Sequence, residues 1–422
     1  MHALINDPLA RRDIHTISIV GLAHGVSHFF HLMLPPLFPW LMRDFSLNYT
    51  QAGFLMTVFF VVSGIGQALA GFVVDRFGAR RALFSGVGLL AVSGFLLGFA
   101  SSYAGLATAA ALAGLGNSVF HPADFTILNR CIAQPRLGHA FSVHGLSGNL
   151  GWAAGPVFMA GIATVAGWQA AAFAAGGIGL AMLAILGWQR SALEPGQEND
   201  TPSGGSHSAG KAASADGSAL AFLRLLPVWL CFGYFVFTTA AFGFLQNYAP
   251  PALAGLYALS LGVATLGLTA YLIGGVAGMA AGGFLAARVD AGERIIVRAL
   301  GVGASIALLL AAGWLPSWFV TPLMFAMGAA VGVAGPSRDL LVRRAAMSTT
   351  GAGAYGRIYG FVYSGLDIGL ASAPLIFGPL MDAGRFALSF ALIGALQAVA
   401  IFTAATVGSR VVPEHAKPAR AA

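Results

Sequence analysis

Long runs of apolar residues, separated by short polar segments, form the main pattern of this chain. A helix needs about 20 apolar residues to cross the hydrocarbon core of a bilayer, and each run is about that long. Cutting the chain at its charged, proline-rich and glycine-rich breaks predicts twelve membrane-spanning helices, at residues 15–42, 50–74, 82–100, 103–130, 139–164, 168–189, 223–250, 258–287, 294–314, 317–343, 352–380 and 386–408.

The composition indicates an all-α membrane protein. Hydrophobic residues make up 57% of the 422 positions and charged residues 9%, against about 25% charged residues in a soluble domain. The mean hydropathy is +0.79. The net charge of +7 lies in the loops, so it indicates orientation in a bilayer rather than a nucleic-acid partner.

The positive charges favour one side of the predicted helices. Of the 22 Lys and Arg residues, all but Arg43, Arg338 and Arg385 fall in or beside the loops on that side. Cytoplasmic loops carry an excess of Lys and Arg. We therefore expect a multi-pass protein of the plasma (inner) membrane, monomeric, with both termini in the cytoplasm.

The chain divides into two halves that repeat one another. Residues 191–218 are rich in Ser, Gly and Ala, which is typical of a flexible linker. This predicts an N-terminal six-helix bundle at 1–190, a cytoplasmic linker at 191–222 and a C-terminal six-helix bundle at 223–422. Motifs recur about 215 residues apart: Pro35-Pro36 with Pro250-Pro251, His121–Asp124 with Gly335–Arg338, Asn149–Gly151 with Asp367–Gly369, and Gly71–Arg76 with Gly283–Arg288. Two pseudo-symmetric bundles with a site between them are the architecture of a rocking transporter.

The segment from Gly71 to Arg81, with the sequence GFVVDRFGARR, resembles the loop-two-three signature of the major facilitator superfamily. In this interpretation Gly71 lets two helices approach closely, and Asp75 meets a helix N-terminus or an arginine across the cytoplasmic face. The resemblance implies a conformational latch, to which we assign Gly71, Asp75, Arg76, Gly78, Arg80, Arg81 and, from the second half, Arg338.

Two further motifs refine the resemblance. Residues Gly151 to Pro156 resemble the helix-five glycine–proline motif of antiporters in that superfamily. Residues 27–37 and 114–122 are similar to the fosmidomycin-resistance branch of drug exporters. These resemblances imply the twelve-helix major facilitator fold, proton-coupled export of a small amphipathic or anionic compound, and no cofactor.

Ionisable groups inside a membrane usually face a cavity or one another. His24, His28 and His31 share one face of helix one because they are spaced i, i+4 and i+7. We expect His28 and His31, with Phe29, to line a substrate cavity, and His24 to be structural. The alternative is that these histidines bond backbone carbonyls of a neighbouring helix.

A second polar group is predicted near the cytoplasmic side. His121 and Asp124 lie one turn apart on helix four, and His144 enters helix five at similar depth. A carboxylate near imidazoles can hold a proton near neutral pH, which predicts proton coupling. The alternative is a packing latch.

Three features of the second half complete the candidate site. Arg338 aligns with Asp124 in the repeat and is expected to pair with it, while the adjacent Asp339 points about 100° away. Asp367 lies at mid-span and is a candidate for both coupling and substrate binding. Further amides assigned to the substrate are Asn149, Gln246 and Asn247.

The alternative cargo is a divalent metal or metal chelate, since imidazoles with a carboxylate suit such ions. Its ligands would come from His28, His31, His121 and Asp124. No phosphate-binding loop supports ATP-driven transport, and the histidine spacing lacks the further boxes of a metalloenzyme, so we expect a transporter rather than an enzyme. The expected partners are the cargo, protons and lipid.

Overall fold

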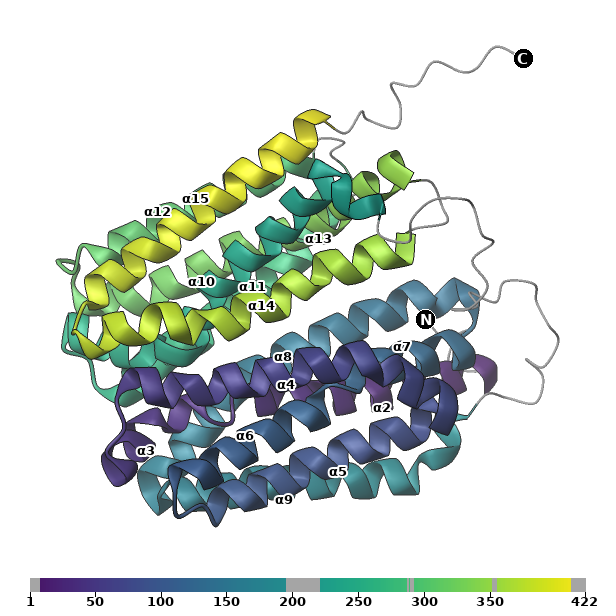
Figure 1. Ribbon diagram of the computed structural model, residues 1–422, viewed down its shortest axis with the longest axis horizontal. Coiled ribbons are helices and arrows are strands. Elements are labelled where there is room, and N and C mark those ends of the chain that lie inside the picture. Colours follow the sequence, from purple (N-terminus) through teal and green to yellow (C-terminus); the bar gives the residue numbers. More distant parts are fainter. Residues whose placement is uncertain (1–7, 195–220, 287, 289–291, 351–354, 411–422) are drawn as a thin grey trace.

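The computed structural model describes residues 8–194, 221–286, 288, 292–350 and 355–410. It contains twelve helical spans that are long and apolar enough to cross a membrane (Figure 1). The part of the chain described in these ranges contains no strand. The twelve-helix expectation is confirmed, while most of the predicted linker, residues 195–220, lies outside the described residues.

The helices follow the order expected from hydropathy. The N-terminal bundle contains α2 (Pro8–His31), η1 (Pro35–Leu37), α3 (Phe38–Phe45), α4 (Tyr49–Phe77), α5 (Ala79–Gly98), α6 (Tyr103–Asn117), α7 (Phe120–Cys131), α8 (Gln134–Ala166) and α9 (Trp168–Trp188), followed by η2 (Arg190–Leu193). The C-terminal bundle, after η4 (Ala221–Arg224), contains α10 (Leu226–Tyr257), α11 (Leu261–Ala286), α12 (Gly292–Ala311), η5 (Ser317–Phe319), α13 (Val320–Thr350), α14 (Tyr355–Asp382) and α15 (Phe386–Arg410).

The packing of the helices repeats between the halves. In the N-terminal bundle α2 packs on α8, α4 on α6 and α5 on α9. The equivalent helices pair in the C-terminal bundle, where α10 packs on α14, α11 on α13 and α12 on α15. Between the bundles α4 packs on α14 and α8 packs on α11 (Figure 1). The pseudo-symmetry that relates the two halves maps one of these contacts onto the other. The packing therefore confirms two pseudo-symmetric bundles.

The backbone departs from the repeat at its proline motifs. The first span breaks after His31 and resumes as η1 at Pro35, whereas α10 continues through Pro250 and Pro251. The fourth span likewise divides into α6 and α7, whereas α13 continues through Pro336. Because proline lacks a backbone N–H, it weakens a helix locally, and the surrounding packing decides whether the helix breaks.

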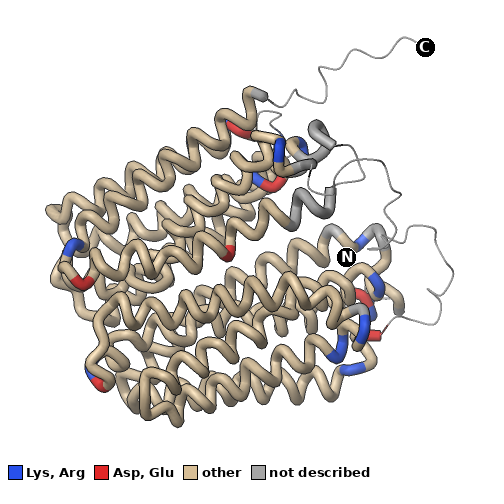
Figure 2. Tube along the Cα trace, viewed as in Figure 1, with Lys and Arg blue, Asp and Glu red and all other residues tan. Residues whose placement is uncertain are grey.

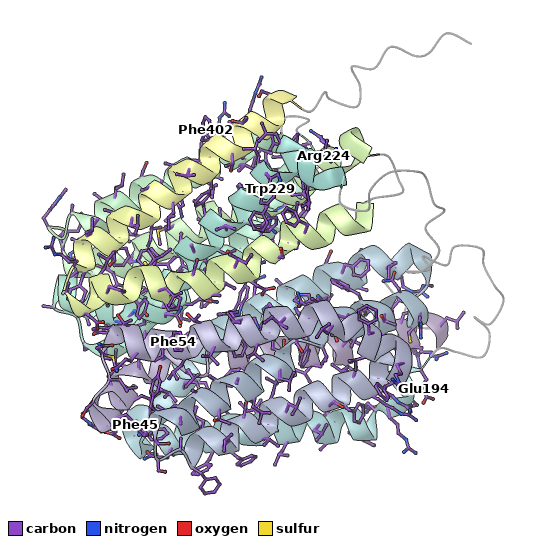
Figure 3. The ribbon with its side chains drawn as sticks, viewed as in Figure 1. Phe45, Phe54, Glu194, Arg224, Trp229 and Phe402 are labelled. Carbon is purple, nitrogen blue, oxygen red and sulfur yellow. The ribbon has the colours of Figure 1, made fainter. Side chains whose placement is uncertain are left out.

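Charged residues gather at the two ends of the bundles (Figure 2). We call one end the basic end, since it carries Arg12, Arg80, Arg81, Arg130 and Arg294. The opposite end carries Asp44 and Asp382. Between the ends the outer surface is apolar; Phe402, for example, points outward from α15 and is 67% exposed (Figure 3). An apolar outer surface is what a lipid-surrounded bundle requires.

Candidate functional site

A cavity of about 160 Å³ lies between the two bundles. Its wall on the N-terminal side is formed by Asn149 and Trp152 of α8. The C-terminal bundle supplies the rest, chiefly Thr238, Thr239 and Phe242 of α10, Tyr271 and Met279 of α11, Arg338 of α13, and Leu366 and Leu370 of α14. A mostly apolar cavity with a few converging polar groups is typical of a small-molecule site. The structure thus places Asn149 and Arg338 at the bundle interface.

Arg338 does not pair with Asp124, contrary to the sequence-based expectation. Its Nε donates to Asp339 Oδ1 at 2.9 Å, and its guanidinium lies 5.0 Å from the centre of the Phe235 ring. The Tyr363 hydroxyl donates to the same Asp339 oxygen at 2.8 Å. The 100° separation of adjacent helical residues is overcome because the long arginine side chain folds back toward its neighbour. The Arg338 side chain is 28% exposed and borders the cavity.

Asp367 lies where α14 packs against α4 of the other bundle. A Cβ placed on Gly64 of α4 would lie 3.5 Å from Asp367 Cβ and 3.7 Å from Asp367 Oδ2. The neighbouring Leu366 and Leu370 line the cavity. Within the described residues no hydrogen bond or ion pair engages the Asp367 carboxylate. An ionisable group at membrane depth without a partner is a functional candidate.

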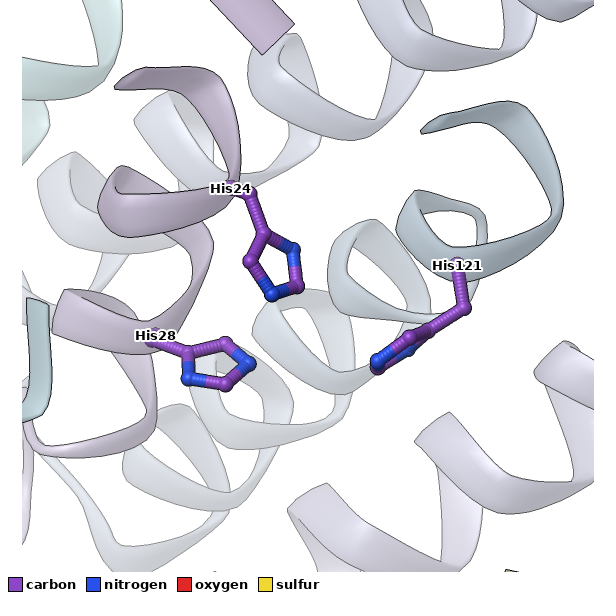
Figure 4. Close-up of side chains that lie close together, drawn as sticks. All are labelled: His24, His28 and His121. Carbon is purple, nitrogen blue, oxygen red and sulfur yellow. The ribbon is translucent and has the colours of Figure 1, made fainter. Parts of the chain in front are cut away.

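A polar cluster fills the interior of the N-terminal bundle. His24 of α2 and His144 of α8 both approach Asp124 Oδ2 of α7, from Nδ1 at 3.3 Å and from Nε2 at 3.1 Å. The rings of His24 and His144 stack with centroids 3.6 Å apart. His28 and His121 turn toward His24 from two different helices (Figure 4). We call these five residues the histidine cluster.

The histidine cluster brings together what the sequence treated as separate groups. The shared face of α2 is present, but His24 lies at its centre and is 2% exposed. The grouping of His121, Asp124 and His144 is also present. His121 Nδ1 lies 3.1 Å from Gln67 Oε1, which pairs the cluster with α4. The role of His121, Asp124 and His144 in proton coupling stays a prediction.

The expected substrate face of helix one lies behind the cavity wall. His28 stacks on Trp152 at 4.3 Å, and the Trp152 indole N–H donates to His31 Nδ1 at 3.2 Å. His31 Nε2 bonds Asn117 Oδ1 at 2.9 Å. Trp152 borders the cavity, whereas His28 and His31 do not. Their role in substrate binding stays a prediction, and in this conformation it would act through Trp152.

Three other proposed substrate residues are buried in helix packing. Phe29 packs edge-to-face with Phe158 at 5.3 Å inside the N-terminal bundle. Asn247 donates to Gly243 O at 2.7 Å on its own helix. Gln246 and Asn247 are each 1% exposed, and Gln246 Nε2 and Asn247 Oδ1 have no partner among the described residues. In this conformation none of the three borders the cavity.

Comparisons with known proteins agree with this arrangement. The family model of the Major Facilitator Superfamily matches residues 20–356. The chain belongs to the Major Facilitator Superfamily. It therefore has the twelve-span fold of a superfamily of secondary transporters, and the expected superfamily resemblance is confirmed.

Relatives within the superfamily are similar over part of their length. The fosmidomycin resistance protein of Escherichia coli (strain K12) is 29% identical over 151 residues, which is 36% of this chain and 37% of the relative. An uncharacterized MFS-type transporter, YfnC of Bacillus subtilis (strain 168), is 30% identical over 144 residues, 34% of each chain. The chain thus spans about a third of each of these relatives. A crystal structure of a bacterial homologue of the human lysosomal transporter Spinster matches with a TM-score of 0.71 at 15% identity, over 96% of this chain and 98% of that one.

The major facilitator loop signature lies at the basic end. Arg80 forms an ion pair with Glu194, which follows η2, and Arg12 donates to Glu194 O at 2.6 Å. Gly78 has φ +88°, a left-handed conformation that favours glycine. Arg76 and Arg81 are exposed, as expected for residues at lipid headgroups. The Asp75 side chain lies outside the described residues.

The explanation given for Gly71 is wrong in this conformation. A Cβ placed there would meet nothing within 4 Å, so no helix approaches it closely. The sequence motif identified the loop correctly, but helix spacing depends on the conformation of the transporter. Close approaches occur instead at other glycines, such as Gly151, where an added Cβ would overlap the Gly25 carbonyl of α2.

A contact between the bundles at the end opposite the basic end was missed by the sequence analysis. The Asp382 carboxylate, at the end of α14, accepts from Tyr49 N at 2.5 Å and from Thr50 N at 3.1 Å and Thr50 Oγ1 at 2.5 Å. Nearby, the Tyr248 hydroxyl donates to Tyr49 O at 3.1 Å. We call this contact the Asp382 gate. Its only sequence signal was an acidic residue at the end of an apolar span.

Proposed function

We propose that this major facilitator transporter exports a small amphipathic or anionic compound in exchange for protons, and that Asp367 carries the proton. The observation that carries the proposal is the Asp367 carboxylate, which lies at the contact between α4 and α14 beside the cavity and has no partner among the residues that the structure describes. A carboxylate at this position changes its surroundings whenever the two bundles rock. Proton binding at Asp367 can therefore be coupled to the direction in which the cavity opens.

The cavity wall supports an amphipathic or anionic cargo. Trp152, Phe242 and Tyr271 supply aromatic surface, which suits an apolar or planar group. Arg338 borders the same space and supplies a positive charge, which attracts an anionic group. Export as the direction rests on the name of the Escherichia coli relative, a fosmidomycin resistance protein.

We place the basic end in the cytoplasm of a bacterial inner membrane, following the rule that cytoplasmic loops are rich in Lys and Arg. With this orientation the Asp382 gate closes the outer side. We infer that in this state cargo enters the cavity from the cytoplasm, as an exporter requires. Opening the outer side requires the hydrogen bonds of the Asp382 gate to break.

Transport into proteoliposomes tests the proposal. Purified protein is reconstituted, a pH gradient is imposed, and accumulation of fosmidomycin and of a panel of organic anions is measured. We expect accumulation of at least one compound driven by the gradient and abolished by collapsing it. Asp367→Asn, which keeps the shape of the side chain, is expected to abolish gradient-driven accumulation while leaving exchange of cargo across the membrane.

Glu293→Gln is the matched control, because Glu293 is another membrane-proximal carboxylate that does not border the cavity. It is expected to behave like wild type. A rate of transport by the wild-type protein that does not depend on the pH gradient contradicts proton coupling. The alternative cargo is tested in the same vesicles by adding Zn²⁺ or Ni²⁺. Gradient-driven uptake of the metal would show that the cargo is a metal ion rather than an organic compound.

A further inference from the structure

We infer that the histidine cluster holds one resident divalent transition-metal ion of the Zn²⁺ class. Its ligands are His24 of α2, Asp124 of α7 and His144 of α8, and water fills the fourth position of the tetrahedron. The ion would join three helices of the N-terminal bundle at one point. This inference goes beyond the proposed transport and does not depend on its cargo or its coupling ion.

The first argument is the spacing of the donor atoms. Zn²⁺ binds imidazole nitrogen and carboxylate oxygen at about 2.0–2.1 Å in a tetrahedron, so two ligand atoms lie about 3.3–3.4 Å apart. His24 Nδ1 lies 3.3 Å and His144 Nε2 lies 3.1 Å from Asp124 Oδ2. Donor atoms of these three residues all lie within 4.8 Å of one another. The distances to Asp124 Oδ2 therefore match those between two ligands of one tetrahedral ion. The rings of His24 and His144 are stacked 3.6 Å apart, so they must rotate for both lone pairs to point at the ion.

His121 flanks this site without completing it. His24, His28 and His121 form a second group of donor atoms within 4.8 Å of one another, which shares only His24 with the first group (Figure 4). Among the described residues, no group within that spacing holds His121 together with Asp124 and His144. His121 Nδ1 instead lies 3.1 Å from Gln67 Oε1 of α4.

The second argument is that two buried polar atoms in the cluster have no hydrogen-bond partner among the described residues. Asp124 is fully buried, and its Oδ2 is bonded to His144 Nε2 while its Oδ1 is not bonded; His24 Nδ1, on a residue 2% exposed, is not bonded either. A buried charge is costly unless it is paired or coordinates a metal. A divalent cation held by this carboxylate would offset its negative charge and engage His24 Nδ1. By contrast, His31 is bonded at both ring nitrogens, so it is not a ligand.

The third argument separates a resident ion from a cargo. All three protein ligands belong to one bundle, and none borders the cavity between the bundles. A cargo must be released when the bundles rock, whereas a site within one rigid bundle keeps its geometry. The expected effect of the ion is therefore to fix α7 against α2 and α8, next to the break between α6 and α7.

The metal content of the 422-residue chain tests the inference. The protein is produced without a polyhistidine tag, purified in detergent, stripped with chelator, loaded with Zn²⁺ and passed through gel filtration. Elemental analysis is expected to find about one zinc per chain. In His144→Gln and in Asp124→Asn we expect zinc affinity to fall at least about 100-fold, because loss of even an outer partner of a ligand costs about 10–100-fold.

His139→Gln is the control for His144→Gln, since His139 lies on the same helix and is exposed. His15→Gln, exposed on α2, is the control for His24→Gln. Both controls are expected to retain zinc. Retention of zinc by His144→Gln, or its equal loss from the controls, overturns the proposed ligand set.

A second measurement keeps the inference testable if a ligand variant fails to fold. Wild-type protein loaded with Co²⁺ is expected to show the strong visible absorption of a tetrahedral nitrogen–oxygen site, and Zn²⁺ is expected to displace it. Absence of a stoichiometric metal in the wild type overturns the inference, and the histidine cluster would then bind protons only. Transport of Zn²⁺ across proteoliposomes would also overturn it, because the ion would then be cargo. Organic-anion transport, measured separately, decides the proposed function whichever way the metal result falls.

Discussion

The Asp382 gate predicts a measurable shift in the conformational equilibrium of the transporter. Asp382→Ala removes a carboxylate that accepts three hydrogen bonds from Tyr49 and Thr50 of the other bundle. These bonds exist only while the two bundles meet at this end. The substitution therefore destabilises the state closed at this end and leaves the open state largely unaffected.

The size of the effect follows from the number of bonds. At an exposed site each bond contributes about 0.5–1 kcal/mol net, so three contribute about 1.5–3 kcal/mol. Because about 1.4 kcal/mol corresponds to a factor of ten, the ratio of closed to open molecules falls roughly 10- to 150-fold. Asp382→Asn keeps one acceptor oxygen and loses the charge, so we expect an intermediate shift.

Cysteine labelling from the gate side measures this shift. A cysteine replaces Thr238 in the cavity wall, and Cys131 and Cys231, both buried, are replaced by serine. A membrane-impermeant maleimide is then added on the side of the Asp382 gate. Labelling is expected to be slow in the parent and faster in Asp382→Ala by a factor in the range given above.

Asp44→Ala is the control for loss of charge at the same end. Asp44 bonds Arg43 and Trp168, both in its own bundle, so its removal does not affect the contact between bundles. Its labelling rate is expected to match the parent. An unchanged rate in Asp382→Ala, or an equal rise in Asp44→Ala, would refute the assignment of Asp382 as a gate.

Three further predictions use other contacts. Gly53→Ala is expected to accelerate the same labelling, because a Cβ there overlaps the Tyr248 hydroxyl and Pro374 across the bundle interface; a rate equal to the parent contradicts this. Gly151→Ala is expected to lower the free energy of unfolding by about 1–3 kcal/mol, and with it the thermal unfolding midpoint, because its Cβ overlaps the Gly25 carbonyl. Gly161→Ala is the control: a Cβ there meets open space on the same helix, so the midpoint is expected to stay unchanged. Arg80→Ala and Glu194→Gln are expected to slow transport equally, with the double variant no slower than either, because the two residues form one ion pair; additive losses would show independent roles.

Hydropathy and internal repetition were sufficient to predict the span count and the two bundles. Each span can be recognised from its own length and composition. An error in the number of spans would have placed the Lys and Arg residues on both sides of the membrane instead of mostly on one. The breaks were harder to predict, because equivalent prolines have different outcomes. The first span breaks before Pro35 and Pro36, while α10 continues through Pro250 and Pro251. The packing around the prolines, rather than the residues themselves, decides this.

The candidate site was predictable in its residues but not in its orientation. The spacing of His24, His28 and His31 correctly placed them on one face of α2. Which way that face points depends on the rotation of α2 against α8, which is set by close packing at Gly151 and is not encoded in periodicity. Asp382 was missed because its partners are the first residues of a helix some 330 residues away.

Proton release on cargo binding tests the central claim, coupling through Asp367, most directly. Purified protein in weakly buffered detergent solution is mixed with a transported compound, and a pH-indicator dye reports protons released per protein. Exchange of cargo for a proton at Asp367 predicts release of up to about one proton per chain in the wild type and in Glu293→Gln, and none in Asp367→Asn, although that variant still binds cargo. Equal proton release by Asp367→Asn and wild type would contradict the account, because the coupling carboxylate would then lie elsewhere.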